Sequence, residues 1–186
     1  MVEFITLQTE RLILRDHRLD DLTTHHQLLS DASAMYYLPD LMTSSTEESR
    51  VNLIRCIVDI HNPDRSKYFL RMELQSTKEH IGEIGYTVTE ATPIGKLVNL
   101  GYFIYPRYWN NGYVTEAVKE ILRFAFEENE VYRIATGCLK ENIGSERVMQ
   151  KCGLIKEAEY KELIWHDGRL KDRVEYRLLR EEWLRH

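Results

Sequence analysis

The segment Val98–Ala117 constrains the fold of this chain most tightly, because it combines a strand pattern, a sharp break and the start of a helix. Val98–Ile104 is apolar enough for a buried strand, and apolar residues then recur on one helical face from Val114 to Ala125. A helix that begins here leaves its first backbone N–H groups without partners and points its positive dipole end outward. Gly112 adds no side chain that would block an approaching group. The segment therefore predicts an anion-binding turn suited to a phosphate.

Size and charge limit the other possibilities. With 186 residues, the chain is long enough for one substantial core and too short for two, so we expect a single domain over residues 1–186. The formal net charge of -5 and the pI near 5.8 argue against a general attraction to nucleic acid or to anionic membranes. No window approaches the roughly 20 apolar residues of a membrane span. Three cysteines without C-x-x-C spacing favour a reducing cytoplasm.

The apolar patterns predict strands and helices in a mixed order. The predicted strands are Thr9–Arg15, Tyr68–Leu74, His80–Val88, Val98–Ile104, Arg133–Leu139, Tyr160–Trp165 and Leu170–Leu179. The predicted helices are Asp20–Leu29 with Asp20 as its cap, one that follows a Ser44/Glu47 capping box and stops before Pro63, one from Val114 to Ala125, and Gly144–Lys151. The second of these repeats Val51, Ile54, Ile57 and Val58 on one side. Strand–helix–strand crossovers in the second half predict a parallel pair within an otherwise antiparallel sheet, with helices on both faces.

Five motifs follow one another over nearly the whole chain. They are Thr9-Glu-Arg-Leu-Ile-Leu-Arg15, Ile81-Gly-x-Ile-Gly85, Tyr108-Trp-x-x-Gly-Tyr-x-Thr-Glu-Ala117, Asn142-x-x-Ser-x-Arg-Val-Met-x-Lys-Cys-Gly153 and Asp167-Gly-Arg169. Together they resemble the GNAT superfamily of acetyl-CoA-dependent N-acetyltransferases, and within it the ribosomal-protein N-terminal acetyltransferases of the RimJ/RimL type. The resemblance implies a GNAT-like α/β fold whose central parallel strands splay apart. It also implies an acyltransferase that uses acetyl-CoA as cosubstrate.

The resemblance assigns coenzyme contacts by position. In the family the pyrophosphate rests on backbone amides of the turn, and the pantetheine arm runs beside the preceding strand. The corresponding residues here are Asn110, Asn111, Gly112, Tyr113, Val114 and Thr115 for the turn, and Tyr102, Phe103 and Ile104 for the strand edge. Asn110 replaces a frequent glycine, and Val114 is bulkier than the usual residue. Asn142 matches an asparagine that hydrogen-bonds coenzyme or peptide backbone, while Arg147 and Lys151, one helical turn apart, could reach the adenosine phosphates.

The proton donor and the base each have a candidate residue and an alternative interpretation. The resemblance suggests Ser145 as the hydroxyl that protonates the departing thiolate, although Ser145 and Asn142 also fit a helix N-terminus that only satisfies backbone amides. Relatives often carry a glutamate on the fourth or fifth strand, where this chain has Asn99 and Ala135. Glu83 is the substitute base, provided that burial raises its pKa toward neutrality. A solvated Glu83, with a water chain that deprotonates the amine, is the alternative.

The sequence and the resemblance also give expectations for a metal, the acceptor and the oligomeric state. None of the seven histidines has metal-ligand spacing, so no metal is expected. The resemblance favours a protein N-terminal α-amino group as acceptor. A small amine acceptor, such as a polyamine or an amino-acid-like molecule, and a non-catalytic module that binds coenzyme A remain open. A homodimer is expected by analogy alone.

Overall fold

The computed structural model describes residues 4–185, which form two compact units. The first unit contains the described residues up to Thr87 together with Gly101–Glu120. The second contains Val88–Leu100 and the described residues from Ile121 onward. Each unit is therefore discontinuous in sequence, and each is described by itself below.

Eight strands form a mixed sheet within the described residues. They are β1 (Thr6–Gln8), β2 (Leu12–Asp16), β3 (Lys67–Leu74), β4 (His80–Thr92), β5 (Gly95–Ile104), β6 (Val131–Leu139), β7 (Ile155–His166) and β8 (Arg169–Leu179). Their order is β1-β2-β3-β4-β5-β6-β8-β7. β5 and β6 pair in parallel, whereas β1–β2, β2–β3, β3–β4, β6–β8 and β7–β8 pair antiparallel. The predicted fold class, a mostly antiparallel α/β sheet with one parallel pair, is confirmed.

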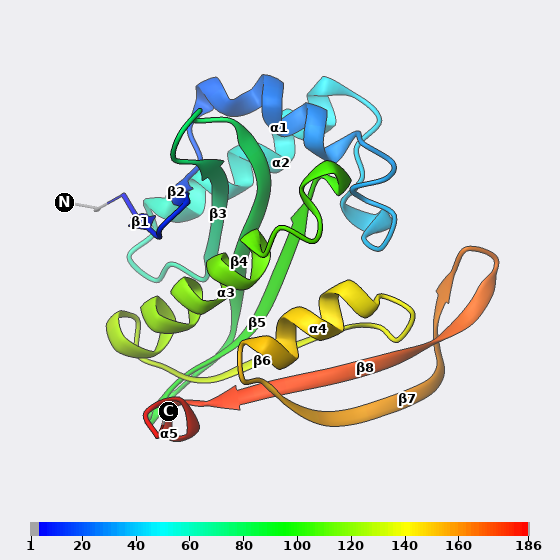
Figure 1. Ribbon diagram of the computed structural model, residues 1–186. Helices are drawn as coiled ribbons and strands as arrows, with labels where there is room; N and C mark the ends of the chain where they lie inside the picture. Colours follow the sequence, from blue (N-terminus) through cyan, green and yellow to red (C-terminus); the bar gives the residue numbers. More distant parts are fainter. Residues whose placement is uncertain (1–3, 186) are drawn as a thin grey trace. The chain divides into compact units, whose positions relative to one another are not determined.

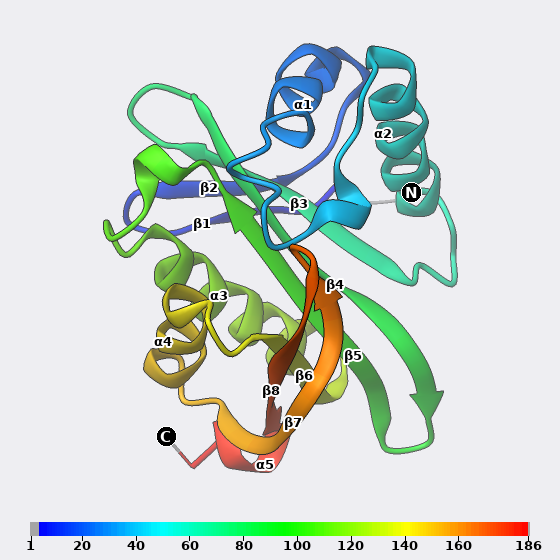
Figure 2. The same ribbon diagram turned by 90° about the vertical axis from the view of Figure 1, so that its right-hand side faces the viewer.

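The first unit places two helices over its strands. α1 (Leu22–Leu29) and α2 (Thr46–Ile60) lie side by side in Figures 1 and 2. Short 3-10 turns η1 (Leu19–Asp21), η2 (Pro39–Leu41) and η3 (Pro106–Tyr108) connect its elements, and α3 (Tyr113–Arg123) begins in this unit. Its core comes from residues that alternate toward one face of each strand, such as Leu12, Leu14, Leu70 and Met72, all fully buried.

The second unit is built on a long hairpin. β7 and β8, drawn in orange and red in Figure 1, turn at Asp167-Gly168 with positive φ at both residues, as the Asp-Gly pair predicts. α4 (Ile143–Lys151) connects β6 to this hairpin, and α5 (Arg180–Trp183) ends it. A π-helical turn, η4 (Phe124–Glu128), follows α3, and Phe126 of this turn stacks on Trp183 with ring centroids 5.9 Å apart.

Three local predictions are wrong at their boundaries. The predicted strand Thr9–Arg15 is shorter, because Thr9 forms a turn in which its Oγ1 accepts the N–H of Leu12 at 3.0 Å. Asp20 does not cap α1, which begins only after η1. The cap of α2 is Ser45, one residue later than predicted, since its Oγ accepts the N–H of Glu48.

The buried face of α2 also differs from the predicted one. Leu53 and Ile60 are buried, whereas Val51, Ile54 and Val58 are exposed, Val58 to 64%. Apolar residues lie on two sides of this helix, and periodicity alone does not indicate which side packs against the strands.

Among the described residues, no helix combines the length and the apolar character that crossing a lipid bilayer requires.

Candidate active site

The turn before α3 takes an unusual backbone conformation at two residues. Asn110 has a φ of 60° and Gly112 a φ of 79°, both in the left-handed region. Glycine adopts this region freely, and asparagine tolerates it better than most residues. The replacement of a frequent glycine by Asn110 is therefore compatible with the turn. The indole of Trp109 donates to the carbonyl of Ile104 at 3.3 Å and anchors the turn to the end of β5.

The same turn exposes backbone donors. The N–H of Glu116 donates to the carbonyl of Gly112 at 3.0 Å, at the start of α3. The amides of Gly112, Tyr113 and Val114 precede it and therefore have no acceptor within the helix. Asn110, Asn111 and Gly112 are exposed to solvent. The positive end of the α3 dipole and several amides thus face an accessible surface, which is the arrangement that binds a phosphate.

A clamp that the sequence analysis did not identify holds this turn, and it consists of Thr9, Arg11 and Glu116. The carboxylate of Glu116 accepts hydrogen bonds from Thr9 Oγ1 at 2.5 Å, from the N–H of Arg11 at 2.8 Å and from Arg11 Nε at 2.7 Å. Arg11 Nη1 also donates to the carbonyl of Asn111 at 3.0 Å, and its guanidinium lies over the ring of Tyr113. Burial alone would raise the pKa of Glu116, but the bonds from Thr9 and Arg11 lower it.

The signal for the Thr9–Arg11–Glu116 clamp was present in two of the motifs, which carry Thr9 and Arg11 in one and Glu116 in the other. The two motifs lie about 100 residues apart, and the spacing within each motif does not predict a contact between them.

The predicted strand edge lies at the end of β5. Tyr102 and Phe103 are half-buried, and Ile104 is buried. Phe103 packs against a cluster formed by Leu28, Leu29, Ala34, Met35 and Tyr105, so Tyr102 points to the opposite face of the strand.

A glycine on β4 lets the end of β5 approach closely. A Cβ on Gly82 would lie 2.4 Å from the carbonyl of Phe103, a distance that real side chains do not tolerate. Gly82 is therefore required for β4 and the end of β5 to lie this close.

Asn142 and Ser145 lie at the start of α4 in the second unit. The side chain of Asn142 accepts the N–H of Ser145 at 3.1 Å, so the capping interpretation is confirmed for Asn142. Ser145 is half-buried, and its hydroxyl hydrogen-bonds to Cys138, whose pKa is raised to about 11 chiefly by burial. Arg147 and Lys151 are exposed on the same helix.

Glu83 occupies a different environment from either predicted one. It is 7% exposed on β4, within reach of three histidines. Its Oε1 lies 2.7 Å from His25 Nδ1 and 3.8 Å from His80 Nε2, and its Oε2 lies 3.6 Å from His17 Nε2. Burial by itself would raise the pKa of Glu83, but the histidines outweigh it and lower the pKa to about 2. The expected rise toward neutrality, and the solvated alternative, are both wrong.

The comparison with known families decides the class of the protein. Residues 11–155 match the family model described as an acetyltransferase (GNAT) domain. The chain belongs to the GNAT acetyltransferases. The chain is 31% identical over 178 residues to the uncharacterized N-acetyltransferase YnaD of Bacillus subtilis, with 95% of this chain and 98% of that protein covered. Members of this family are acetyl-CoA-dependent acyltransferases, as the motifs predicted.

Solved structures with the same fold act on different acceptors. The ribosomal-protein-S5-alanine acetyltransferase of Vibrio fischeri superimposes with a TM-score of 0.82 at 18% identity, covering 96% of this chain and 98% of the other. The spermidine N-acetyltransferase of Vibrio cholerae, solved with CoA and spermine, gives a TM-score of 0.79 at 21% identity, with 93% and 98% covered. At these identities the likeness establishes the fold of this GNAT acetyltransferase and leaves its acceptor open.

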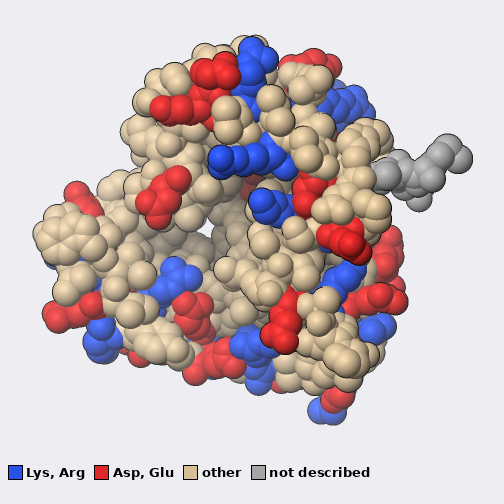
Figure 3. Space-filling model, turned by 180° about the vertical axis from the view of Figure 1, so that it is seen from behind, with Lys and Arg blue, Asp and Glu red and all other residues tan. Residues whose placement is uncertain are grey.

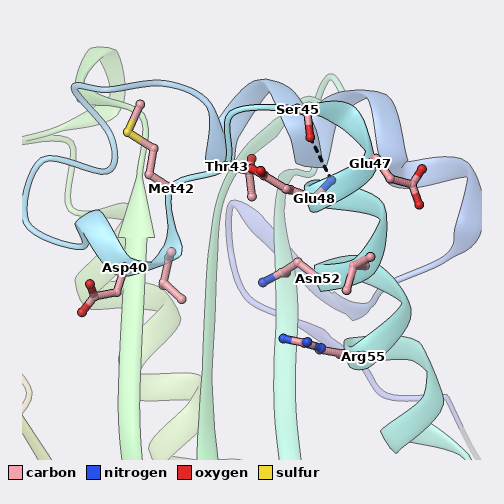
Figure 4. A pocket seen from close by; sticks show the side chains of 10 residues that line it. Asp40, Met42, Thr43, Ser45, Glu47, Glu48, Asn52 and Arg55 are labelled. Carbon is pink, nitrogen blue, oxygen red and sulfur yellow. Dashed lines mark hydrogen bonds between the residues drawn. The ribbon is translucent and has the colours of Figure 1, made fainter.

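A pocket of about 450 Å³ lies beside α2 in the first unit of the GNAT acetyltransferase. Figure 4 shows Asn52 and Arg55 on α2 and, across from them, the segment that carries Asp40 and Met42. Glu47 and Glu48 add two further carboxylates to the lining. Glu47 also pairs with Arg50 at 3.3 Å, so three carboxylates face two guanidinium groups. This small acidic excess suits a cationic amine.

On the face drawn in Figure 3, basic and acidic side chains are intermixed over the surface.

Proposed function

We propose that this GNAT acetyltransferase transfers the acetyl group of acetyl-CoA to the α-amino group at a protein N-terminus. The turn before α3, whose exposed amides follow the end of β5, is the observation that supports binding of acetyl-CoA. The motifs resembling the RimJ/RimL type, and the fold shared with a ribosomal-protein acetyltransferase, support the acceptor. Within residues 4–185, Cys56, Cys138 and Cys152 form no disulfide, which supports a reducing cytoplasm as the location.

In the proposed mechanism the amine attacks the thioester directly. The residues of the turn, Asn110 to Thr115, hold the diphosphate, and the edge of β5 at Tyr102, Phe103 and Ile104 holds the pantetheine arm. Backbone N–H groups near Phe103 and Ile104 stabilise the oxyanion, an effect of about 3 kcal/mol for one such donor. Ser145 protonates the leaving thiolate, while Asn142, Arg147 and Lys151 contact the coenzyme.

Deprotonation of the amine proceeds through water in this proposal. A carboxylate whose pKa is about 2 is a weak base, so Glu83 does not take the proton directly. An amine that arrives partly deprotonated, together with an ordered water chain, needs no dedicated carboxylate.

A small cationic amine is the second candidate acceptor, because Asp40, Glu47 and Glu48 line the pocket beside α2. The shared fold with a spermidine acetyltransferase points the same way. Thiol release from acetyl-CoA, measured with a panel of N-terminal peptides and of polyamines, separates the candidates. The proposal predicts a kcat/KM at least about tenfold higher for a peptide than for any polyamine. The reverse ranking selects the small amine, and coenzyme binding without accelerated thiol release by any amine identifies a non-catalytic module.

A further inference from the structure

Three histidines and one glutamate meet in the interior of the first unit. His17 and His25 are fully buried, and His80 and Glu83 are exposed by only 5% and 7%. One ligand atom each from His17, His25 and Glu83 lies within 4.8 Å of the others. The rings of His17 and His25 meet edge to face, with centroids 5.1 Å apart.

Hydrogen bonding leaves this cluster incompletely satisfied. Neither ring nitrogen of His17 has a hydrogen-bond partner among the described residues, and the same holds for Nδ1 of His80. Buried polar atoms are almost always paired, since leaving one unpaired costs about 1 to 3 kcal/mol. His17 Nε2 lies 3.6 Å from Glu83 Oε2, which is too long for a hydrogen bond and short enough for both atoms to bind one ion.

The surrounding groups orient His25 as a metal ligand is usually oriented. Its Nε2–H donates a hydrogen bond to Asn52 Oδ1 at 3.0 Å, and this leaves Nδ1 directed at Glu83 Oε1, 2.7 Å away. A ligating histidine commonly donates its other N–H to such an oxygen, which fixes the tautomer.

Arg71, a cationic side chain of the first unit, is already paired with carboxylates. The guanidinium of Arg71 lies 2.6 Å from Glu73 and 3.6 Å from Asp21, so its charge is compensated.

We propose that His17 Nε2, His25 Nδ1 and the carboxylate of Glu83 bind one Zn²⁺ ion. Two imidazoles and a carboxylate are a donor set that zinc prefers, with bonds of about 2.0 to 2.2 Å. Tetrahedral bonds of this length place ligand atoms about 3.4 Å apart, and the 2.7 and 3.6 Å distances around Glu83 bracket that value. His80 Nε2, 3.8 Å from Glu83 Oε1, hydrogen-bonds to the carbonyl of Gly82 at 3.1 Å and is not one of the three ligands.

The proposed ion joins three segments of the first unit. His17 follows β2, His25 lies on α1 and Glu83 on β4, so one ion links the helix to the sheet of the first unit. Their wide separation in sequence is why the sequence analysis expected no metal.

Zinc titration of untagged, chelator-treated protein tests the site. The proposal predicts one equivalent of tightly bound Zn²⁺ per chain by calorimetry and elemental analysis, and a Tm higher by about 5 °C with zinc. His17→Gln and His25→Gln lose the equivalent, while His166→Gln, which alters a buried histidine outside the cluster, retains it. Absence of stoichiometric zinc from the unaltered protein, or its retention in both cluster variants, overturns the proposal.

If the cluster variants do not fold, X-ray absorption at the zinc edge of the unaltered protein identifies the atoms that ligate the ion. Ligation by two or three imidazoles plus a carboxylate supports the site. Sulfur ligands, or oxygen ligands alone, place the ion elsewhere and overturn it.

Discussion

Gly112 is the residue whose backbone conformation matters most to the coenzyme turn. A Cβ at this position would meet only Arg11 Nη2, at 3.5 Å, so a side chain here has room. The obstacle to substitution is the φ of 79°, which costs a non-glycine residue about 1 to 2 kcal/mol. Any backbone shift that relieves this strain also moves the amides that are proposed to bind the diphosphate.

Gly112→Ala is therefore expected to raise the KM for acetyl-CoA by about tenfold, since misplaced amides lose much of their contact with a phosphate. Steady-state kinetics with a saturating acceptor measures it. Gly168→Ala is the matched control, because Gly168 also has a positive φ, of 74°, with nothing within 4 Å of its Cβ position. Gly168→Ala should lose a similar amount of stability and leave the KM for acetyl-CoA unchanged. Equal changes of this KM in both variants would argue against a role of the turn in coenzyme binding.

Substitutions of Ser145 test whether its hydroxyl is the proton donor. Ser145→Ala keeps the backbone N–H that Asn142 accepts, so the helix cap survives while the hydroxyl is lost. If the hydroxyl protonates the thiolate, kcat falls by about 100-fold with little change in Tm. Ser145→Thr, which retains a hydroxyl, should recover part of the rate. An unchanged kcat under conditions where chemistry limits turnover would remove Ser145 from the mechanism.

Asp21 links stability to pH in the first unit. Burial alone would raise its pKa, but bonds from Arg15 and the N–H of Arg18 and the charge of Arg71 hold it at about 2, below the ordinary value of 3.8. Because the folded-state pKa is lowered, its contribution is present above pH 3.8 and is lost as the pH falls through 2.

Asp21→Asn should therefore lower the free energy of unfolding by about 2 kcal/mol at neutral pH, and the difference from the unaltered protein should shrink between pH 4 and pH 2. Urea unfolding at a series of pH values measures both effects. A difference that is constant across that window would mean that the carboxylate charge is not what stabilises the fold.

At the scale of elements, the Thr9–Arg11–Glu116 clamp joins the turn between β1 and β2 to the first turn of α3. Arg11→Ala removes the side-chain bonds from Nη1 to the carbonyl of Asn111 and from Nε to Glu116, and it keeps the bond from the backbone N–H of residue 11 to Glu116. We expect the KM for acetyl-CoA to rise about fivefold with kcat nearly unchanged, because the clamp positions the turn and takes no part in chemistry. Arg50→Ala, which breaks only a surface pair with Glu47, is the control.

A double-mutant cycle with Glu116→Gln tests whether Arg11 and Glu116 act together. Coupled residues give a double variant whose KM is close to that of the worse single variant. Fully additive effects of the two changes would show that Arg11 acts on the coenzyme independently of Glu116.

Elements with one strong pattern were predicted well, and those with competing patterns were not. β5, the break and α3 follow directly from apolar spacing and Gly112, and the turn between β7 and β8 follows from Asp167-Gly168. The predicted start of β7 at Tyr160 was wrong, because β7 begins at Ile155. The apolar residues of α2 lie on two faces, so their spacing predicted the wrong buried side. At Thr9 a hydrogen bond from the N–H of Leu12 to the side chain delays the start of the strand to Leu12, an effect that spacing does not reveal.

At the scale of the whole molecule, the fold class and the family were accessible from ordered motifs, whereas long-range contacts were not. The environment of Glu83 depends on His17, His25 and His80, which no local pattern connects to it. The roles of Tyr102, Asn142, Ser145, Arg147 and Lys151 remain predictions, as do a single domain over residues 1–186 and a homodimer.

The binding of acetyl-CoA, compared with that of S-acetylpantetheine, tests the central claim most directly, because the second molecule keeps the thioester and lacks the diphosphate. Isothermal titration should show one acetyl-CoA per chain and an affinity for acetylpantetheine at least about 100-fold weaker, since the amides before α3 hold the diphosphate. Equal affinities for the two molecules, or no saturable binding of acetyl-CoA, would contradict the account.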